Sequence, residues 1–410
     1  MEFRKVYTTI LVFVLAILSL AYSLNIETGY LYVDSKLSNI GSTTQAFNML
    51  PLRFSKDTKF DGTFYVKTGL TLNNTYDNLY VHFSGDFYGF SLPVPVTVPI
   101  INEAYTYVCT DFGDFKGGRF VEKLPDSEVF NVYDEVGSKI DTQKLPITGG
   151  MYTYTSDFGT LKVIVYSALE GIPTSPEATF TVKTNLPENV KAQIIKNLSS
   201  SSSNIVLEDQ KLIDHFNLGV NWMGNLSNID YYVLLGLKKA DYMMIDKITS
   251  EGANVKKPYI FTLSNGLVYQ IPSKPFIIHN YLSYESDSVS NFNVYVPSLS
   301  QNVEIEEKVP DSLNEVIGVE YQLGSNGIIG FDTYVNLKDF KYNDTVFGLY
   351  GSYKKDKLNL KYVVKYNLES KVFDILYEAS YNFDKNAGIF IRGIKNSDDN
   401  LIMLGVESRT

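Results

Sequence analysis

The sequence predicts an all-β protein, an antiparallel up-and-down transmembrane β-barrel of about 16–22 strands. Two observations lead to this prediction. Side chains alternate between apolar and polar over long segments, and these segments follow one another with short turns between them. The segments are about 10–13 residues long, whereas most strands have about 5–6. A tilted strand needs about 9–11 residues to cross a bilayer, so this length favours a membrane barrel.

The clearest hairpin runs through residues 357–383. One face of each strand carries leucine, valine, isoleucine, tyrosine or phenylalanine, and the other carries polar and charged residues. Adjacent strands are expected to set Lys361 and Lys365 across from Asp374 and Glu378. Opposite charges in such positions stabilise a sheet.

The same alternation recurs along the rest of the chain. It is found in residues 64–66, 79–83, 180–182, 216–222, 229–237, 316–323, 329–337, 387–395 and 400–408. We expect longer connections near 121–149, 199–211, 240–256 and 285–314, and a single barrel domain over residues 24–410. The acidic segment 303–311 has no strand rhythm, and no useful helical periodicity follows the first 23 residues.

The first 23 residues have the layout of a secretory signal peptide. Arg4 and Lys5 precede an uncharged, mostly apolar run over 6–20, and small residues at Ala21 and Ser23 permit cleavage after Ser23. The alternative is a permanent membrane anchor, but the run is short for a span of about 20 residues. We therefore expect residues 1–23 to be a signal peptide and the mature protein to be exported to the outer membrane.

Composition narrows the possible partners. The net charge of −10 argues against nucleic acid, because no basic stripe is available to neutralise phosphates. The single cysteine, Cys109, cannot form an intramolecular disulfide. The chain has 31 Tyr and 25 Phe, an enrichment typical of strands and of the aromatic belts at membrane surfaces.

The alternation by itself is compatible with two architectures. In a two-sheet sandwich the polar faces meet water, whereas in a barrel they line the lumen. Strand length, the number of strands and aromatic residues near strand ends, such as Tyr366, Tyr381 and Phe383, favour the barrel. The alternative is a structural or adhesive envelope protein, either a plugged barrel or a soluble β-sandwich.

The sequence contains no recognisable catalytic, cofactor-binding or metal-binding motif. The three histidines, His82, His215 and His279, have no ligand spacing, and we expect them to be solvated residues of the lumen or of loops. Cys109 has no evident paired base. The sequence therefore predicts a protein that is not an enzyme and needs no cofactor.

The stretch AYTYVCTDFGDFKGGRF, from Ala104 to Phe120, resembles a hairpin of bacterial outer-membrane porins: an aromatic strand, a tight turn and a strand ending in Gly-Arg-Phe. The resemblance implies a channel in which a long loop after an early strand folds into the lumen, and residues 121–149 are placed to do so. The constriction candidates that follow are Arg119, Asp126, Glu128, Asp134 and Glu135. The chain departs from many such barrels by lacking an aromatic residue at its C-terminus.

The predicted function is passive diffusion of small solutes through the outer membrane. The polar faces are expected to line an aqueous path and to select solutes by pore width and charge. The pore-lining candidates are Glu320, Asp332, Lys361, Lys365, Asp374, Glu378 and Arg392. The expected partners are outer-membrane lipid and small solutes, and association into a homo-oligomer is left open.

Overall fold

The structure of the 410-residue chain is a computed structural model. It describes residues 21–35, 58–90, 96–120, 147–167, 178–200, 205–207, 216–240, 242–248, 253–384, 387–395 and 399–409. Most of the predicted signal peptide, residues 1–20, lies outside these ranges, as do residues 121–146 of the predicted constriction loop.

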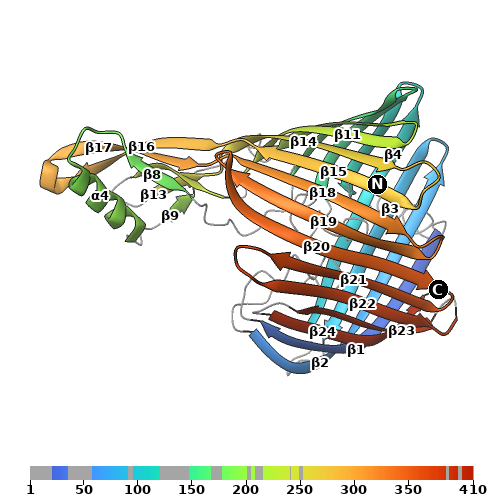
Figure 1. Cartoon of the computed structure of the whole chain (residues 1–410). Helices are drawn as coiled ribbons and strands as arrows, with labels where there is room; N and C mark the ends of the chain where they lie inside the picture. The colour runs from blue at the N-terminus through green and yellow to red at the C-terminus, as the bar shows by residue number, and fades with distance from the viewer. Residues whose placement is uncertain are drawn as a thin grey trace, which may run out of the picture.

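Eighteen strands of the described residues form one antiparallel sheet (Figure 1). They are β1 (Ala21–Ser35), β2 (Thr58–Tyr76), β3 (Leu79–Phe90), β4 (Val96–Thr110), β5 (Gly113–Phe120), β6 (Ile147–Ser156), β7 (Gly159–Ser167), β10 (Asn217–Leu226), β11 (Ile229–Lys239), β14 (Tyr259–Gln270), β15 (Phe276–Glu285), β18 (Ser312–Gln322), β19 (Gly327–Lys338), β20 (Lys341–Lys355), β21 (Leu358–Asn367), β22 (Phe373–Asn382), β23 (Ala387–Lys395) and β24 (Asp399–Arg409).

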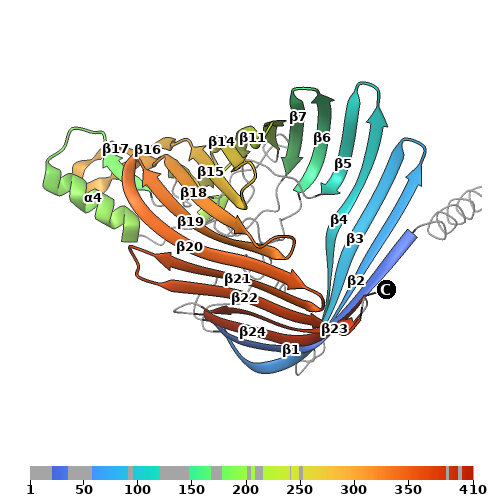
Figure 2. The same cartoon turned by 45° about the vertical axis from the view of Figure 1, so that its right-hand side comes forward.

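Each of these strands pairs with the next, and the last pairs with the first. β24 lies antiparallel to β1, with Arg409 opposite Asn25 and Asp399 opposite Ser35. The pairings therefore run through a complete ring of strands. In Figure 2, β2–β7 rise on one side of the molecule and β18–β24 lie on the other. The predicted antiparallel, up-and-down barrel is confirmed, and its strand number falls within the predicted range.

Short turns join the strands at one end of the barrel, which we call the turn end. Two of these turns have the same design, at Thr110–Gly113 and Ser156–Gly159. In each, the hydroxyl of the first residue donates to the carbonyl of the glycine, at 2.5 and 3.1 Å. The glycines have φ values of 126° and 139°, which side-chain-bearing residues rarely adopt. The first turn confirms the predicted hairpin within residues 104–120.

A lobe extends from the opposite end of the barrel, which we call the lobe end (Figure 1). Three successive connections between barrel strands build it. Its elements are β8 (Thr179–Val182), α4 (Glu188–Ser200), β9 (Ile205–Leu207), β12 (Met244–Ile248), β13 (Ala253–Lys256), β16 (Ser288–Val296), η3 (Pro297–Leu299) and β17 (Gln301–Val309). The strands form two three-stranded sheets, in the orders β12-β13-β9 and β16-β17-β8. Among the described residues, no helix is both long enough and apolar enough to cross a membrane.

The lobe has a hydrophobic core of its own. Phe292 of β16 and Val303 and Ile305 of β17 alternate inward and are at most 2% exposed. Val182 of β8 and Ile194 of α4 pack against them. Burial of these side chains supplies the hydrophobic stabilisation that three separate loops would lack.

A buried carboxylate joins the two sheets of the lobe. Glu307 and Ser290 lie opposite each other on β17 and β16. The Ser290 hydroxyl donates to the carbonyl of Ile245 at 2.6 Å, and the Ile245 N–H donates to Glu307 at 2.7 Å. Burial raises the pKa of Glu307, and the Ile245 hydrogen bond opposes that rise.

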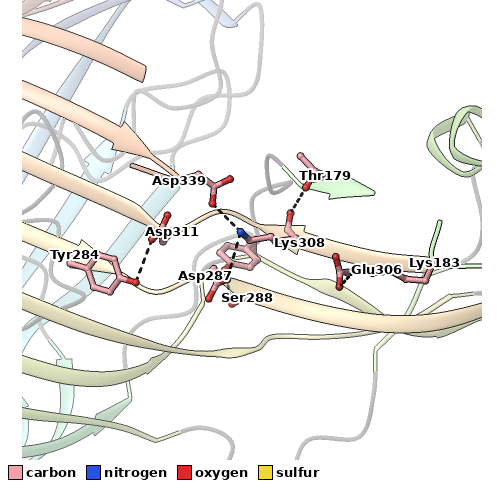
Figure 3. A network of polar contacts seen from close by, with 10 residues as sticks. Thr179, Lys183, Tyr284, Asp287, Ser288, Glu306, Lys308, Asp311 and Asp339 are labelled. Carbon is pink, nitrogen blue, oxygen red and sulfur yellow. Dashed lines mark hydrogen bonds and ion pairs between the residues drawn. The ribbon is translucent and has the colours of Figure 1, made fainter. Parts of the chain in front are cut away.

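Ion pairs connect the lobe to the barrel at the base of β16 and β17 (Figure 3). The Lys308 Nζ lies 2.9 Å from Asp339, which follows β19, and 3.8 Å from Asp287. The Tyr284 hydroxyl of β15 donates to Asp311 at 3.5 Å. These contacts attach the bases of β16 and β17 to the rim of the barrel.

The lobe differs from the sequence-based expectations in several respects. Residues 303–311 were expected to lack a strand, but β17 covers most of them, because its pairing with β16 and β8 orders the acidic segment. Helix α4 forms although no useful helical periodicity was expected, because packing against the lobe stabilises it. The predicted strand at 180–182 forms as β8, but it belongs to the lobe and not to the barrel. The long connections at 240–256 and 285–314 contain strands.

Candidate functional site on the inner wall of the barrel

Side chains of the barrel strands alternate between an outward and an inward face. On β18, Ile317 and Val319 are 53% and 42% exposed, whereas Val316 and Glu320 are each 1% exposed. Outward apolar residues are similarly exposed on the neighbouring strands: Leu235, Leu237, Phe261, Leu267, Ile278, Phe331, Leu349, Ile375, Ile389, Leu404 and Val406. So large an apolar surface is what a transmembrane barrel presents to lipid.

The inward face of β21–β23 carries a patch of alternating charges. Lys361 lies opposite Glu378, and Lys365 lies opposite Asp374, as the sequence predicted. Glu378 also lies opposite Arg392, whose Nε is 3.2 Å from a carboxylate oxygen of Glu378. Lys365 and Arg392 are 2% and 6% exposed. Opposite charges on adjacent strands offset the cost of placing ions on this wall.

A buried histidine–aspartate pair lies further round the inner wall. The Nε2 of His279 on β15 is 2.9 Å from Oδ1 of Asp332 on β19, and both side chains are fully buried. Gly318 of β18 lies between them and is in register with both. A Cβ at Gly318 would come within 2.0 Å of Asp332 and 2.3 Å of His279. The glycine is therefore required for the two side chains to meet.

A tyrosine–glutamate pair repeats this arrangement one strand further round the barrel. The Tyr350 hydroxyl on β20 donates to Glu320 on β18 at 2.9 Å. Gly330 of β19 lies between them in register, and a Cβ there would lie 2.2 Å from the Tyr350 ring. Glu320 and Asp332 thus belong to one polar layer that spans β15 to β20.

The sequence pattern does not indicate the partners of these carboxylates. The alternation places Glu320 and Asp332 on the polar face, but His279, which we expected to be solvated, is buried and paired. His82 is partly buried, with Nε2 3.6 Å from Glu103, and His215 lies outside the described residues. Gly318 and Gly330 are the sequence feature that could indicate these pairs, because each leaves room for two side chains to meet across it. They indicate the pairs only when the strand register is known.

The opposite wall, formed by β2–β7, is hollowed at the turn end. A cavity of about 630 Å³ is lined there by aromatic and basic residues, among them Tyr80, Tyr105, Tyr107, Lys116 and Lys162. The Lys116 Nζ lies over the Tyr105 ring, 4.0 Å from its centre. The cavity is of a size typical of small-molecule sites.

The predicted constriction residues are only partly described. Arg119 on β5 lies opposite Ala104 and Thr148. The register puts it on the same face as the exposed ring of Phe115, away from the inward-facing Phe120. Arg119 therefore does not lie on the inner face of the wall. Asp126, Glu128, Asp134 and Glu135 lie outside the described residues.

The fold and the two-faced wall define the class of protein, a β-barrel with an apolar exterior and a polar, charged interior. Among solved structures, the chain is similar to Pseudomonas aeruginosa OccK5 (OpdH), with 12% identity, a TM-score of 0.49, and coverage of 95% of this chain and 97% of that one. It is also similar to P. aeruginosa OpdQ, with 10% identity, a TM-score of 0.48, and coverage of 96% and 98%.

A mutant of the Rhodopseudomonas blastica porin has 11% identity and a TM-score of 0.39, with coverage of 95% of this chain and 100% of that one. No protein-family model and no curated protein matches the sequence. The barrel is established by its own strand pairings.

Proposed function

We propose that this chain forms a channel in an outer membrane, through which small solutes diffuse passively down their gradients. The observation that carries the proposal is the ring that eighteen strands of the described residues form, with apolar side chains outside and charged side chains inside. Lipid would cover the outer face, and the inner charges would select solutes by sign and size. On this proposal the protein is a channel and not an enzyme.

The two ends of the barrel support an orientation. Outer-membrane barrels keep their short turns in the periplasm and their longer connections outside the cell. The turn end would therefore face the periplasm, and the lobe would stand on the cell surface. The proposed pore-lining residues are Glu320, Asp332, Lys361, Lys365, Asp374, Glu378 and Arg392, with Asp126, Glu128, Asp134 and Glu135 as proposed constriction residues.

Export rests on the signal-like start of the sequence. Cleavage after Ser23 would remove the first three residues of β1, which begins at Ala21. The pairing of β1 with β24 starts only at Asn25, so the ring would keep all of its pairings between the first and last strands. N-terminal sequencing of protein from the cell envelope is expected to begin at Leu24. A first residue upstream of Ala21 would contradict cleavage at this site.

The channel is tested by conductance across a planar lipid bilayer. Cys109 is exposed and lines the inner-wall cavity, so it offers a native site for a thiol-specific reagent. We expect conductance steps from the folded protein, and a smaller step after reaction with an anionic methanethiosulfonate. The Cys109→Ser variant should conduct before and after exposure to the reagent. Pure, folded protein without steps would rule out the channel.

A plugged structural barrel is the second candidate. It is favoured by the near-complete burial of inward charges such as Glu320, Asp332 and Lys365, since a wide aqueous path would expose them. The soluble sandwich is not what the chain forms, because its long strands belong to one ring. A plugged barrel would give heat-modifiable gel migration after detergent extraction but no conductance. Recovery in the soluble fraction would contradict both candidates.

A further inference from the structure

The turns at the turn end differ in chemistry from one side of the ring to the other. Four of those that the structure describes are two-residue turns that begin with an aspartate, so the residue after the aspartate occupies a matched position. That position holds Asn78 between β2 and β3, Phe112 between β4 and β5, Phe158 between β6 and β7, and Lys357 between β20 and β21. Phe112 and Phe158 are 81% and 83% exposed. The matched residue is thus apolar on one side of the barrel and charged on the other.

The side that carries lysine lies across the barrel from the side that carries phenylalanine. In the ring of strand pairings, β21 is diametrically opposite β6. Lys354, Lys355 and Lys357 are all exposed around their turn. At its other end, β20 begins after a turn that carries Phe340, which is 68% exposed beside the Tyr284 ring. The apolar surface therefore reaches the turn end on one side of the barrel and the lobe end on the other.

Each phenylalanine turn satisfies its own backbone polar groups. The N–H of each phenylalanine donates to the hydroxyl of the residue two positions before it, at 3.3 Å in both turns. Its carbonyl accepts a hydrogen bond from a tyrosine of the next hairpin. The Tyr152 hydroxyl donates to Phe112 at 2.5 Å, and the Tyr231 hydroxyl donates to Phe158 at 2.9 Å. The same device thus closes two successive hairpins.

Both tyrosines lie on the outward face of the wall. Tyr152 is opposite Phe115, which is 51% exposed, and their ring centres are 5.1 Å apart. Tyr231 is opposite Gly224, where a Cβ would lie 2.5 Å from the tyrosine oxygen, so the glycine leaves room for the hydroxyl. Backbone groups that meet lipid must be satisfied within the protein, because no water can replace a missing hydrogen bond. The phenylalanine turns meet this requirement.

The aspartates of the same turns limit how deep the rings can lie. Asp111 and Asp157 directly precede the two phenylalanines, and both are exposed. A carboxylate is costly among acyl chains but not at the level of the headgroups, where water is present. The rings can therefore enter the acyl chains only at their border with the headgroups.

We propose that the turns of Phe112 and Phe158 insert into the bilayer at this border, whereas the turn of Lys357 stands in water. The barrel then sits obliquely, and its β4–β7 side binds lipid through its turns as well as through its strands. This goes beyond an aromatic belt at the strand ends, which would surround the barrel evenly. The inference rests on the proposed function only in placing the barrel in a membrane.

Fluorescence of single tryptophans tests the depth of each turn. Trp222 is the one tryptophan of the chain and lies on the outward face of β10. In the Trp222→Phe background, Phe112→Trp, Phe158→Trp and Lys357→Trp place the probe at matched positions. The full-length proteins are folded into vesicles with and without phosphatidylcholine brominated near the headgroup end of one acyl chain. Quenching at positions 112 and 158 should be at least twofold stronger than at 357, with emission at shorter wavelength.

The two tyrosines provide a crossed control. Tyr152→Phe removes the hydrogen bond to the turn at 112, and Tyr231→Phe removes the bond to the turn at 158. Each should weaken quenching of the probe in its own turn, because the freed carbonyl draws water to it, and should leave the other probe unchanged. Equal effects of both variants on both probes would overturn the role of the tyrosines.

The outcomes separate this inference from the proposed function. Heat-modifiable migration identifies the variants that fold. Quenching at 357 as strong as at 112 and 158, or no quenching at any of the three, would overturn the oblique position of the barrel. Quenching of Trp222 in the unmodified protein would still place the barrel in the membrane. Absence of that quenching would instead contradict the proposed function itself.

Discussion

Strands β17 and β18 follow each other along the chain, yet they turn the same alternating pattern to opposite surroundings. In β17, Val303 and Ile305 are fully buried in the lobe core. In β18, Ile317 is 53% exposed and Glu320 is 1% exposed. The lobe buries its apolar face as a protein in water does, whereas the barrel exposes that face as a membrane protein does. Alternation identifies the residues that share a face, but not the medium that the face meets.

The largest effect is expected from removing a large side chain from the lobe core. Phe292→Ala should lower the free energy of unfolding of the lobe by about 3–5 kcal/mol, because it leaves a cavity in a small core. Limited proteolysis should then cleave the lobe while the barrel keeps its heat-modifiable migration. Phe331→Ala, on the outward face of β19, is the control and should leave the lobe resistant. If Phe292→Ala also abolished the heat-modifiable migration, the barrel would depend on the lobe core, and the proposed difference between the two regions would be wrong.

A charge on the outward face of the barrel should have the next largest effect. Val319→Arg is expected to reduce the stability of the barrel in lipid by about 2–4 kcal/mol if the residue lies near the middle of the bilayer. Denaturant titrations of protein folded into lipid vesicles measure the change. Thr181→Arg, at an exposed position of β8 in the lobe, should change little. Equal tolerance of both substitutions would argue against lipid around β18.

A smaller effect is expected from Glu307, the buried carboxylate of the lobe. Burial raises its pKa in the folded protein above that in the unfolded chain. Its contribution to stability is therefore fully present below the unfolded pKa and is lost as pH rises through the folded pKa. Glu307→Gln should remove this decline while keeping an acceptor for the Ile245 N–H.

Limited proteolysis of the lobe at pH values across the acidic range measures the effect of Glu307. Glu304→Gln, at an exposed position of the same strand, is the matched control and should keep the wild-type profile. The same pH dependence in Glu307→Gln as in the wild type would show that another group is responsible.

The smallest effect is expected at the junction between lobe and barrel. Lys308→Met removes the ion pairs to Asp339 and Asp287, which are partly exposed and screened by salt. Hydrogen exchange at residues 284–288 and 309–312 should become slightly faster at low salt. At high salt the variant and the wild type should converge. A large change that persists at high salt would mean that Lys308 supports packing as well as charge.

The prediction from sequence was most accurate where a strand is long and regular. The faces of β21 and β22, and the charge pairs between Lys361 and Glu378 and between Lys365 and Asp374, follow from period-two alternation and a tight hairpin. The prediction was weakest in the lobe, where β17 and α4 depend on partners that lie far away in the sequence. The pairing of His279 with Asp332 required the register of three strands around Gly318.

The sequence by itself determined which residues lie on the same side of each strand, because the side-chain period of a strand is a local property of the backbone. Tertiary structure alone decided that β24 meets β1 to complete the ring, and that the apolar side of the ring faces outward. It also decided that the apolar side of β17 faces a core. The reason is that an alternating strand is symmetric with respect to its two faces. Only the curvature of the sheet and the elements that pack against it assign those faces to lipid, lumen or core.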